Sequence, residues 1–240
     1  MISFIVPVYN EEKYIARTLE NLKGFNLVPH EIIVSDDGSS DQTVEIARKY
    51  ADQVVAWQRL KNPTIGAARN RGAAVAKYPY LVFIDSTVRI PELNKFFSIA
   101  LEDFKNHPKL VGLAVNVQVE PQNATFFDRF FFGMMDRWYQ FNNNFLKFGM
   151  AQGKFQMVKT EIYKKTGGFS ETLVAGEDIE FFGKLRKFGA TLLEPRLTVF
   201  HSGRRAHAVG WPKLLFIWMI NGIGALIFKR SVSKEWKTIR

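Results

Sequence analysis

The chain has 240 residues, 47% of them hydrophobic, which suits one large domain, or one domain with an appendage, that needs no disulfide to hold its core. It contains no cysteine, which excludes thiolate metal sites and a cysteine nucleophile. Its formal net charge of +10 favours anionic partners, namely phosphorylated substrates, anionic lipid or nucleic acid.

The first half of the chain alternates strand and helix signals. Strands that alternate with helices of about 10–15 residues imply βαβ units, and therefore an α/β fold with a Rossmann-like, mostly parallel sheet flanked by helices. Ser39 and Gln42 predict a capping box that opens the second helix. The expected strands are 2–8, 31–35, 54–57 and 80–84, and the expected helices are 11–22, 44–51 and 66–77.

The second half continues with mixed signals. After Pro91, residues 92–105 have the pattern of a helix. Residues 110–119 alternate in hydropathy, which predicts an antiparallel strand. Two further strands are expected at 155–158 and 192–200, with a helix at 179–188 that ends at Gly189.

Two segments contain more large apolar side chains than a core needs. Residues 126–148 interleave aromatic residues with Asp and Arg, and residues 211–230 include the apolar stretch 214–228 followed by two basic residues. A spanning helix needs about 20 apolar residues, so this stretch favours a helical tail that lies in the membrane interface. The alternatives are a helix docked on the core and a true span that includes 206–210. We expect removal of 211–240 to weaken membrane binding without unfolding the first 200 residues.

Carboxylates follow two of the predicted strands. Asp85 ends the apolar run 80–84, and Asp36 and Asp37 follow 31–35. Burying a carboxylate is costly unless its charge is compensated, and open α/β sheets bind ligands beyond the carboxyl ends of their strands. The two strands therefore predict one site for a metal ion or for the hydroxyls of a ligand. The alternative for each Asp is a turn or a helix cap.

Seven short motifs, in their order and spacing, resemble the family 2 glycosyltransferases, whose catalytic domain has the GT-A fold. They are VPVYNEE at 6–12, DDGSSD at 36–41, GAARNRG at 66–72, FIDST at 83–87, GGF at 167–169, GEDIE at 176–180 and HSGRR at 201–205. The resemblance implies a nucleotide-sugar-dependent glycosyltransferase with a catalytic domain over 1–205. Within it, 1–120 would bind the nucleotide sugar and 121–205 the acceptor, and 206–240 would form the membrane-interface tail.

The resemblance also implies a nucleoside pocket at the ends of the first two strands. Carboxylates suit such a pocket because they accept hydrogen bonds from base N–H groups and ribose hydroxyls. For Glu11, favourable charge at a helix N-terminus is the alternative. Arg69 would bind the nucleotide and its phosphates, whereas Arg71 points elsewhere on the helix and is expected to be solvated. The candidate pocket residues are Pro7, Tyr9, Glu11, Asp36 and Asp37.

In the family, an Asp-x-Asp motif binds the Mn²⁺ or Mg²⁺ that bridges the diphosphate. This chain has Asp85, Ser86 and Thr87 at that place, and the Thr hydroxyl is a much weaker ligand for a hard cation than the missing acid. Asp85 and His201 are the candidate metal ligands, although a His after a strand can equally be structural. The candidate ligands of the diphosphate are Asp85, Ser86, Arg204 and Arg205, and the two arginines could themselves neutralise the leaving group.

Glu177 and Asp178 open a predicted helix, where negative charge is favourable and where a cap is the alternative role. The resemblance implies that Asp178 is the base that deprotonates the acceptor hydroxyl as it attacks the anomeric carbon with inversion, and that Glu177 orients the acceptor. These roles require Asp85, Asp178 and His201 to converge around one pyrophosphate.

The predicted partners are a UDP- or GDP-sugar, a lipid-linked or glycan acceptor, and a membrane surface bound through 126–148 and 211–230. No basic leader precedes the first strand, so we expect a cytoplasmic protein on the inner face of the cell membrane. A nucleotidyltransferase, a dinucleotide dehydrogenase and a nucleic-acid-binding protein are disfavoured because their motifs are missing. The alternative function, suggested by the missing second acid, is a non-catalytic module that binds a nucleotide sugar or a membrane surface.

Overall fold

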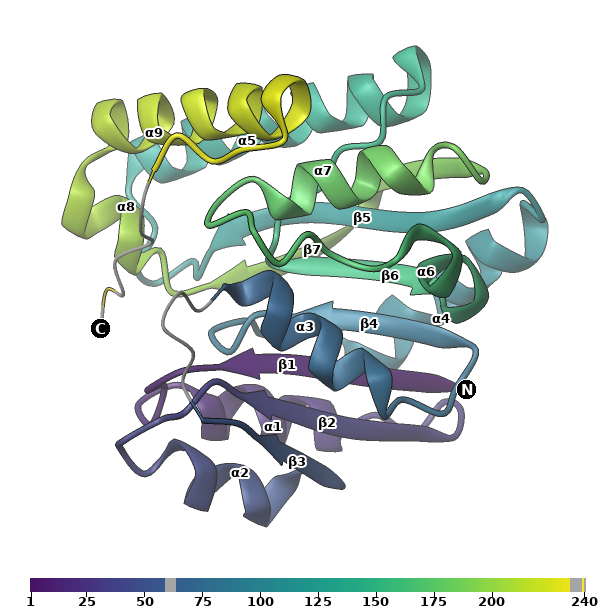
Figure 1. The fold of residues 1–240 in the computed structure, drawn as a ribbon, viewed down its shortest axis with the longest axis vertical. Coiled ribbons are helices and arrows are strands. Elements are labelled where there is room, and N and C mark those ends of the chain that lie inside the picture. Colours follow the sequence, from purple (N-terminus) through teal and green to yellow (C-terminus); the bar gives the residue numbers. More distant parts are fainter. Residues whose placement is uncertain (59–63, 234–238, 240) are drawn as a thin grey trace.

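The computed structural model describes residues 1–58, 64–233 and 239, which form an α/β fold around one mixed sheet (Figure 1). In these residues the sheet has seven strands in the order β3-β2-β1-β4-β6-β5-β7. Strands β1 to β4 run parallel, β5 and β7 run parallel to each other, and β6 is antiparallel to both β4 and β5. The predicted class and the mostly parallel sheet are confirmed. The strands are β1 Ile2–Val8, β2 His30–Asp36, β3 Gln53–Ala56, β4 Tyr80–Ile84, β5 Leu110–Val119, β6 Phe155–Lys159 and β7 Ala190–His201.

Helices cover both faces of the sheet. Helices α1, α2 and α4 pack on one face, in a cluster that contains Phe4 and Phe97. Helices α3, α6 and α7 pack on the other face around Phe83 and Phe181, and they form the front layer in Figure 1. The helices are α1 Ile15–Lys23, α2 Thr43–Tyr50, α3 Ile65–Ala74, α4 Leu93–Asn106, α5 Phe126–Phe141, α6 Thr160–Thr166, α7 Glu177–Leu185, α8 Arg204–Val209 and α9 Trp211–Ile223, with π-helical turns η1 Asn142–Leu146 and η2 Gly224–Phe228.

Two local predictions need correction. The capping box of Ser39 and Gln42 is wrong: Ser39 donates its hydroxyl hydrogen to Asp36 Oδ1 at 2.5 Å. Asp41 takes the capping role, because its Oδ1 accepts from the backbone N–H of Thr43 at 3.0 Å. The strand at 110–119 is antiparallel to β6, as predicted, but it is also parallel to β7, which its alternation in hydropathy did not indicate.

One edge of the sheet gathers the carboxyl ends of its strands. Because every described strand except β6 points the same way, these ends meet on the left in Figure 1. Pro7 is tolerated in the central strand β1 because β1 pairs with β4 only as far as Ile5, so no acceptor on that side needs the missing N–H. Ligands of open α/β sheets bind beyond such an edge.

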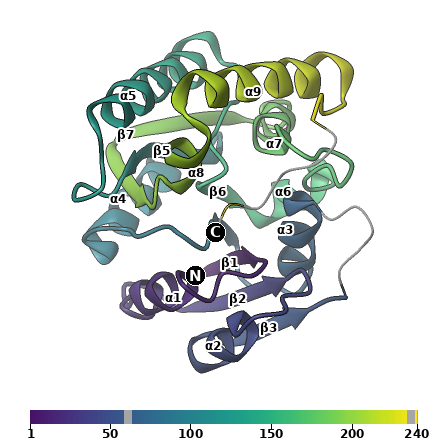
Figure 2. The ribbon, with the colours of Figure 1, turned by 90° about the vertical axis from the view of Figure 1, so that its left-hand side faces the viewer.

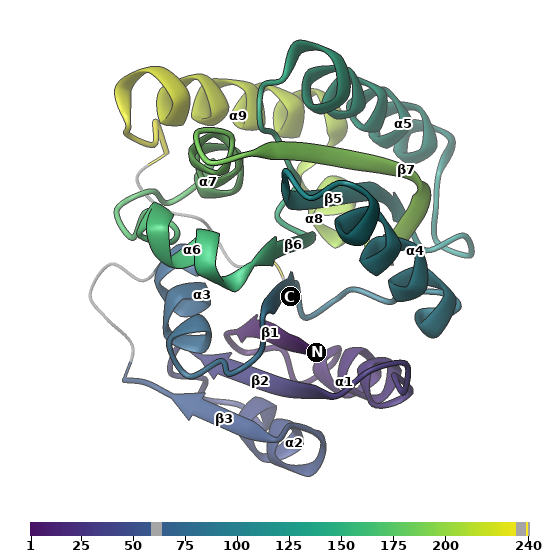
Figure 3. The same cartoon turned by 90° about the vertical axis from the view of Figure 1, so that its right-hand side faces the viewer.

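The C-terminal elements dock beyond β7. Figures 2 and 3 both show α5 and α9 side by side there. Trp211, at the start of α9, is buried, donates its indole N–H to Asp128 of α5 at 2.8 Å and packs edge-on against Phe132. The tail is therefore bound to the core through one face. These contacts argue against the expectation that 211–240 can be removed without effect on the first 200 residues.

The alternative of a membrane span that includes 206–210 is wrong. Gly210, with a φ of +83°, separates α8 from α9 and breaks the helix that such a span would need. Over the described ranges, none of the helices combines the length and the apolar character that a membrane crossing requires.

Candidate active site

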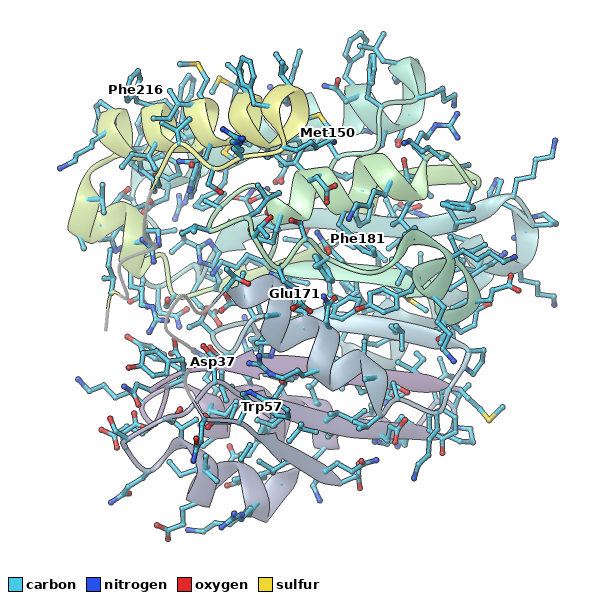
Figure 4. The ribbon with its side chains drawn as sticks, viewed as in Figure 1. Asp37, Trp57, Met150, Glu171, Phe181 and Phe216 are labelled. Carbon is cyan, nitrogen blue, oxygen red and sulfur yellow. The ribbon has the colours of Figure 1, made fainter. Side chains whose placement is uncertain are left out.

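The carboxyl ends of β2 and β3 form the first part of the site. Asp37, directly after β2, accepts a hydrogen bond from Arg71 Nη2 at 2.5 Å. The guanidinium carbon of Arg71 lies 5.7 Å from the ring centroid of Trp57, and Figure 4 shows Asp37 and Trp57 close to each other at this edge. The expectation that Arg71 is solvated is therefore wrong, since only 14% of its side chain is exposed.

Arg69 faces the opposite way, because residues two apart on a helix point about 200° apart. It is almost completely buried, donates to Glu177 Oε1 at 2.7 Å and to the carbonyl oxygen of Gly153 at 2.8 Å, and stacks over the ring of Phe169. The structure thus places Arg69 behind the first turn of α7, away from Asp37.

The other predicted nucleoside residues lie at the same edge but already have partners. The carboxylate of Asp36 accepts from the backbone N–H groups of Gly38 and Ser39 within its own turn. Both oxygens of Glu11 accept from the guanidinium of Arg204. Pro7 is buried in β1, and Tyr9, which follows the strand, is half-buried. The nucleoside assignments of these residues stay predictions.

Asp85 follows β4 and forms the centre of the second part of the site. Its Oδ2 accepts from Lys154 Nζ at 2.8 Å, and its Oδ1 accepts from the hydroxyl of Thr87 at 2.8 Å. Burial opposes ionisation, but the charge and hydrogen bond of Lys154, the hydrogen bond of Thr87 and the charge of Arg204 together outweigh it and hold the pKa of Asp85 well below its usual range. Ser86 is buried, and its carbonyl oxygen accepts from Thr18 at 2.8 Å.

Helix α8 adds two cations to this centre. The pKa of Arg204 is raised, because the bonds and charge of Glu11 outweigh burial. Burial and the charge of Arg204 lower the pKa of Arg205 to about 10. The charge of Asp85 contributes to the pKa values of both arginines, of Glu11 and of His201, so these groups surround it. The site is therefore rich in positive charge next to one carboxylate.

His201, the last residue of β7, is neutral at physiological pH. Burial and the nearby charge of Lys154 lower its pKa to about 3. Its Nδ1 accepts from the backbone N–H of Gly203 at 3.1 Å, which places the proton of the neutral ring on Nε2. Nε2 is buried and has no hydrogen-bond partner among the residues that the structure describes.

Asp178 lies in the first turn of α7, next to Glu177. Burial, followed by the negative charge of Glu177, raises the pKa of Asp178 to about 7, against the opposing charge of Arg69. As a whole residue Asp178 is half-buried. A carboxyl that titrates near neutral pH is suited to act as a general base.

The C-terminal elements hold the start of α7. Gly176 has a φ of +85°, and a Cβ there would lie 2.9 Å from Ala225 Cβ and 3.0 Å from the carbonyl oxygen of Asn221. Ser231 Oγ accepts from the backbone N–H groups of Val174 and Ala175 at 2.8 and 3.0 Å. The position of Asp178 therefore depends on residues far along the chain.

Two consecutive residues before β6 join the two halves of the site. A Cβ on Gly153 would lie 3.1 Å from Asp178 Oδ2, and the next residue, Lys154, binds Asp85. Because β6 is antiparallel to β4, with Phe155 opposite Ile84, this loop is brought to the end of β4. The negative charge of Asp85 acts on the pKa of His201, so these two groups lie near each other, and Asp178 is connected to Asp85 through this loop. That the three residues share one pyrophosphate stays a prediction.

The donor set does not fit the divalent ion that the sequence predicts on Asp85 and His201. Across the described ranges, no three His, Cys, Asp or Glu side chains are placed to share a metal ion. Both oxygens of Asp85 accept hydrogen bonds, one of them from an ammonium group. His201 offers a proton on Nε2, whereas a metal ligand must offer a lone pair.

Three residues at or beside the site were not identified from the sequence. Lys154 lies in no motif, and only its place opposite the end of β4 gives it a role. Trp57 was assigned to a strand, but its ring packs on Arg71. Glu120, which is buried, accepts hydrogen bonds from Arg17 and Arg89 and braces the end of β5 next to His201. Pairing between distant strands determines these contacts, and the local sequence does not show that pairing.

Comparison with curated proteins gives partial matches. Validoxylamine A glucosyltransferase from Streptomyces hygroscopicus subsp. limoneus is 36% identical over 93 residues, which is 37% of this chain and 20% of that protein. Poly-beta-1,6-N-acetyl-D-glucosamine synthase from Staphylococcus aureus is 29% identical over 125 residues, which is 51% of this chain and 30% of that protein. The chain therefore matches less than a third of the length of these relatives.

Solved structures match over most of the chain. The mannosyltransferase PcManGT from Pyrobaculum calidifontis, in complex with GDP-Man and Mn²⁺, has a TM-score of 0.73 at 17% identity, over 95% of this chain and 64% of that one. TarS from S. aureus, in complex with UDP-GlcNAc, has a TM-score of 0.62 at 22% identity, over 82% of this chain and 57% of that one. Glucosyl-3-phosphoglycerate synthase from Mycobacterium tuberculosis, in complex with Mn²⁺, UDP-Glc and phosphoglyceric acid, has a TM-score of 0.60 at 18% identity, over 95% of this chain and 79% of that one. These likenesses show that the fold is GT-A.

The family model of glycosyl transferase family 2 matches residues 3–167, a stretch that runs from β1 through α6 and includes Asp37, Arg71, Asp85 and Lys154. Since this stretch is well over half of the sequence, and the fold and the strand-end site agree with it, the chain belongs to glycosyl transferase family 2.

Proposed function

We propose that this protein transfers a sugar from a nucleotide-sugar donor to a hydroxyl of an acceptor, with Asp178 as the general base. The observation that supports this most directly is the environment of Asp178. Its pKa of about 7 lies near neutral pH, and it adjoins the loop 153–154 that also binds Asp85. UDP- and GDP-sugars are the donors to test first, because the solved relatives contain GDP-Man, UDP-GlcNAc and UDP-Glc.

In the proposed step, the proton and the electron pair are both accounted for. The acceptor oxygen forms a bond to the anomeric carbon while its proton passes to the carboxylate of Asp178. The bond between the anomeric carbon and the diphosphate oxygen breaks, and the electron pair leaves with the nucleoside diphosphate. We propose inversion, which requires the base on α7 and the cations around Asp85 to act from opposite sides of the transferred sugar.

We further propose that the acceptor is lipid-linked and that the protein binds the cytoplasmic face of a membrane. The support is helix α5, whose polarity is reversed. Its buried face carries the carboxylates of Asp128 and Asp136, whereas its outer face exposes large apolar side chains, including Phe126 at 76%. A contiguous exposed apolar surface of this kind marks an interaction site. The exposed large apolar residues of α5, η1 and the following turn are Phe126, Phe127, Phe130, Met134, Trp138, Phe141, Phe145, Leu146 and Phe148.

Helix α9 extends the same surface. Phe216, labelled in Figure 4, lies on its outer side, and Met219, Ile223 and Ile227 follow at helical spacing. Basic residues flank this stripe, as in helices that lie among lipid headgroups. We name the exposed apolar side chains of α5, η1, α9 and η2 the aromatic face. Lipid is favoured over a protein partner because basic residues, among them Arg129, Arg137 and Lys213, are exposed between and beside the apolar side chains of the two neighbouring helices (Figures 2 and 3).

Binding and turnover assays test the proposed chemistry. The full-length protein is screened by thermal shift against UDP, GDP and dTDP with and without Mn²⁺, and release of nucleoside diphosphate is then measured from the matching sugar donors. One nucleotide should raise the melting temperature, and its sugar donor should be consumed. Asp178→Asn should lower turnover by about 10²–10⁴-fold with little change in nucleotide binding.

Glu161→Gln is the matched control, because Glu161 is an exposed acid in the first turn of α6. It should leave turnover unchanged. Failure of every nucleotide to bind would contradict the proposed function. Nucleotide binding without turnover in the wild type would favour the non-catalytic module.

A further inference from the structure

The carboxylate at the metal position of this family fold already holds a cation of the protein. Lys154 Nζ lies 2.8 Å from Asp85 Oδ2, and the two side chains are 31% and 19% exposed. An ammonium group has three N–H donors, and Asp85 accepts one of them. The pair is therefore both fixed and open enough for the remaining donors to reach a ligand.

Thr87, at the position of the second acid of the Asp-x-Asp motif, also binds Asp85. Thr87 directs its hydroxyl hydrogen and its backbone N–H to Asp85 Oδ1, at 2.8 and 3.1 Å. Both oxygens of Asp85 are thus engaged by donors. A divalent ion would have to displace these donors and would face the repulsion of Lys154, Arg204 and Arg205.

His201 points to an anionic ligand rather than to a cation. Its Nδ1 accepts from the backbone N–H of Gly203, so Nε2 carries the proton. Nε2 is buried and unpartnered within the described part of the chain, and a buried donor without an acceptor is costly. A phosphate oxygen would satisfy it.

We infer that Lys154 takes the place of the divalent ion, so that this chain binds and releases its nucleoside diphosphate without metal. The inference rests on the proposed function. As the bond between the anomeric carbon and the diphosphate oxygen breaks, the electron pair stays on that oxygen. Lys154 donates a hydrogen bond to the diphosphate and keeps its proton, and Arg204 and Arg205 share the negative charge.

Nucleotide binding tests the inference without an activity assay. The affinity of the full chain for UDP and for GDP is measured by isothermal titration calorimetry, once in EDTA and once in excess Mn²⁺. The wild type should bind one nucleotide equally, within about twofold, in both buffers. Lys154→Met should weaken binding in EDTA by about tenfold or more, since a charge-assisted hydrogen bond is lost, and Lys154→Arg should restore most of it.

Lys159→Met is the matched control, because Lys159 lies at the other end of β6 and donates to the carbonyl oxygen of Pro108. It should bind nucleotide as the wild type does. Wild-type binding that falls tenfold or more in EDTA would overturn the role of Lys154 and leave the proposed function standing. Absence of nucleotide binding in every buffer would overturn both.

A designed gain of metal binding gives a second test. In Thr87→Asp combined with Lys154→Ala, the second acid is restored and the competing ammonium is removed. Mn²⁺ binding, followed by electron paramagnetic resonance in the presence of UDP or GDP, should be present in this double variant and absent in the wild type. Equal Mn²⁺ binding by both proteins would overturn the inference.

Discussion

Arg69 and Arg71 have different physical roles although they lie two positions apart on α3. Arg69 is buried and neutralises Glu177, and it thereby limits how far the neighbouring charge raises the pKa of Asp178. Arg71 holds Asp37 at the strand ends and packs on Trp57, where a nucleoside would lie. One arginine therefore supports the proposed base, and the other lies at the proposed nucleotide end of the site.

We expect replacement of Arg69 to affect mainly stability and replacement of Arg71 to affect mainly nucleotide binding. Arg69→Ala leaves the buried carboxylate of Glu177 unpaired and should lower the free energy of unfolding by about 3–5 kcal/mol. Arg71→Ala should cost less stability but should weaken UDP or GDP binding by about tenfold or more. Urea denaturation and calorimetry measure the two effects, and the opposite pattern would contradict these assignments.

The raised pKa of Asp178 predicts a pH dependence. Only the ionised carboxylate can accept the acceptor proton, and with a pKa of about 7 its population falls as the pH drops below that value. Thus kcat/KM should rise with pH up to about 7 and then level off. Initial rates from about pH 5 to about pH 9 test this. A profile that is flat across neutral pH would remove Asp178 from the role of base.

At the scale of elements, the hydrophobic runs of the sequence predicted the limits of the strands in the first half of the chain. The four strands of the first half lie within one residue of their expected limits. Strands β1, β2 and β4 are largely buried on both faces and are therefore continuous apolar runs, whereas the edge strand β3 is only half-buried. The acids after β2 and β4 lie at one edge of the sheet because both strands run parallel to β1. The partner of Asp85 could not be predicted, because Lys154 reaches it only through the antiparallel pairing of β6 with β4.

Helix α5 illustrates a second limit of sequence patterns. Its aromatic residues suggested an unusual segment, but the pattern did not show that its acids point inward. The carboxylate of Asp128 faces inward because it accepts hydrogen bonds from Trp211, His207 and the capping residue Thr125. Two of these partners come from the C-terminal elements, so the inward position of Asp128 depends in part on the docked tail, whereas Asp136 is held by Val117, Gln118 and Gln152.

The aromatic face should determine binding to vesicles. Phe126→Ser combined with Phe130→Ser removes two side chains that are 76% and 54% exposed, so folding should be unaffected. Co-sedimentation with anionic liposomes at low salt should weaken by about tenfold or more. The control is Leu27→Ser, which removes an exposed apolar side chain between α1 and β2. Equal binding by the wild type and the double variant would argue against a membrane role.

At the scale of the whole molecule, the C-terminal elements complete the core as well as the aromatic face. Trp211 and Leu214 are buried in the same cluster as β1 and α4. Ala225 and Ser231 contact the segment that leads into α7. The donor-binding strands and the tail therefore form one packed unit.

A chain that ends at Gly210 should be markedly less stable than the full chain. The loss of Trp211 and Leu214 alone removes about 1.5–3 kcal/mol of burial energy for each side chain and uncovers Phe132. Thermal unfolding should show a clearly lower midpoint for this truncation than for the full chain. Equal midpoints for the two proteins would show that the tail is not part of the core.

The contact of Gly176 with Asn221 and Ala225 also has a consequence for synthesis of the protein. While the chain grows on the ribosome, every recognisable motif has been made by residue 205, and Arg69 can already pair with Glu177. The turn at Gly176 still lacks its neighbours Asn221 and Ala225 at that point. A message cut short before residue 221 would encode a protein that a motif search accepts but that lacks part of the support for the first turn of α7.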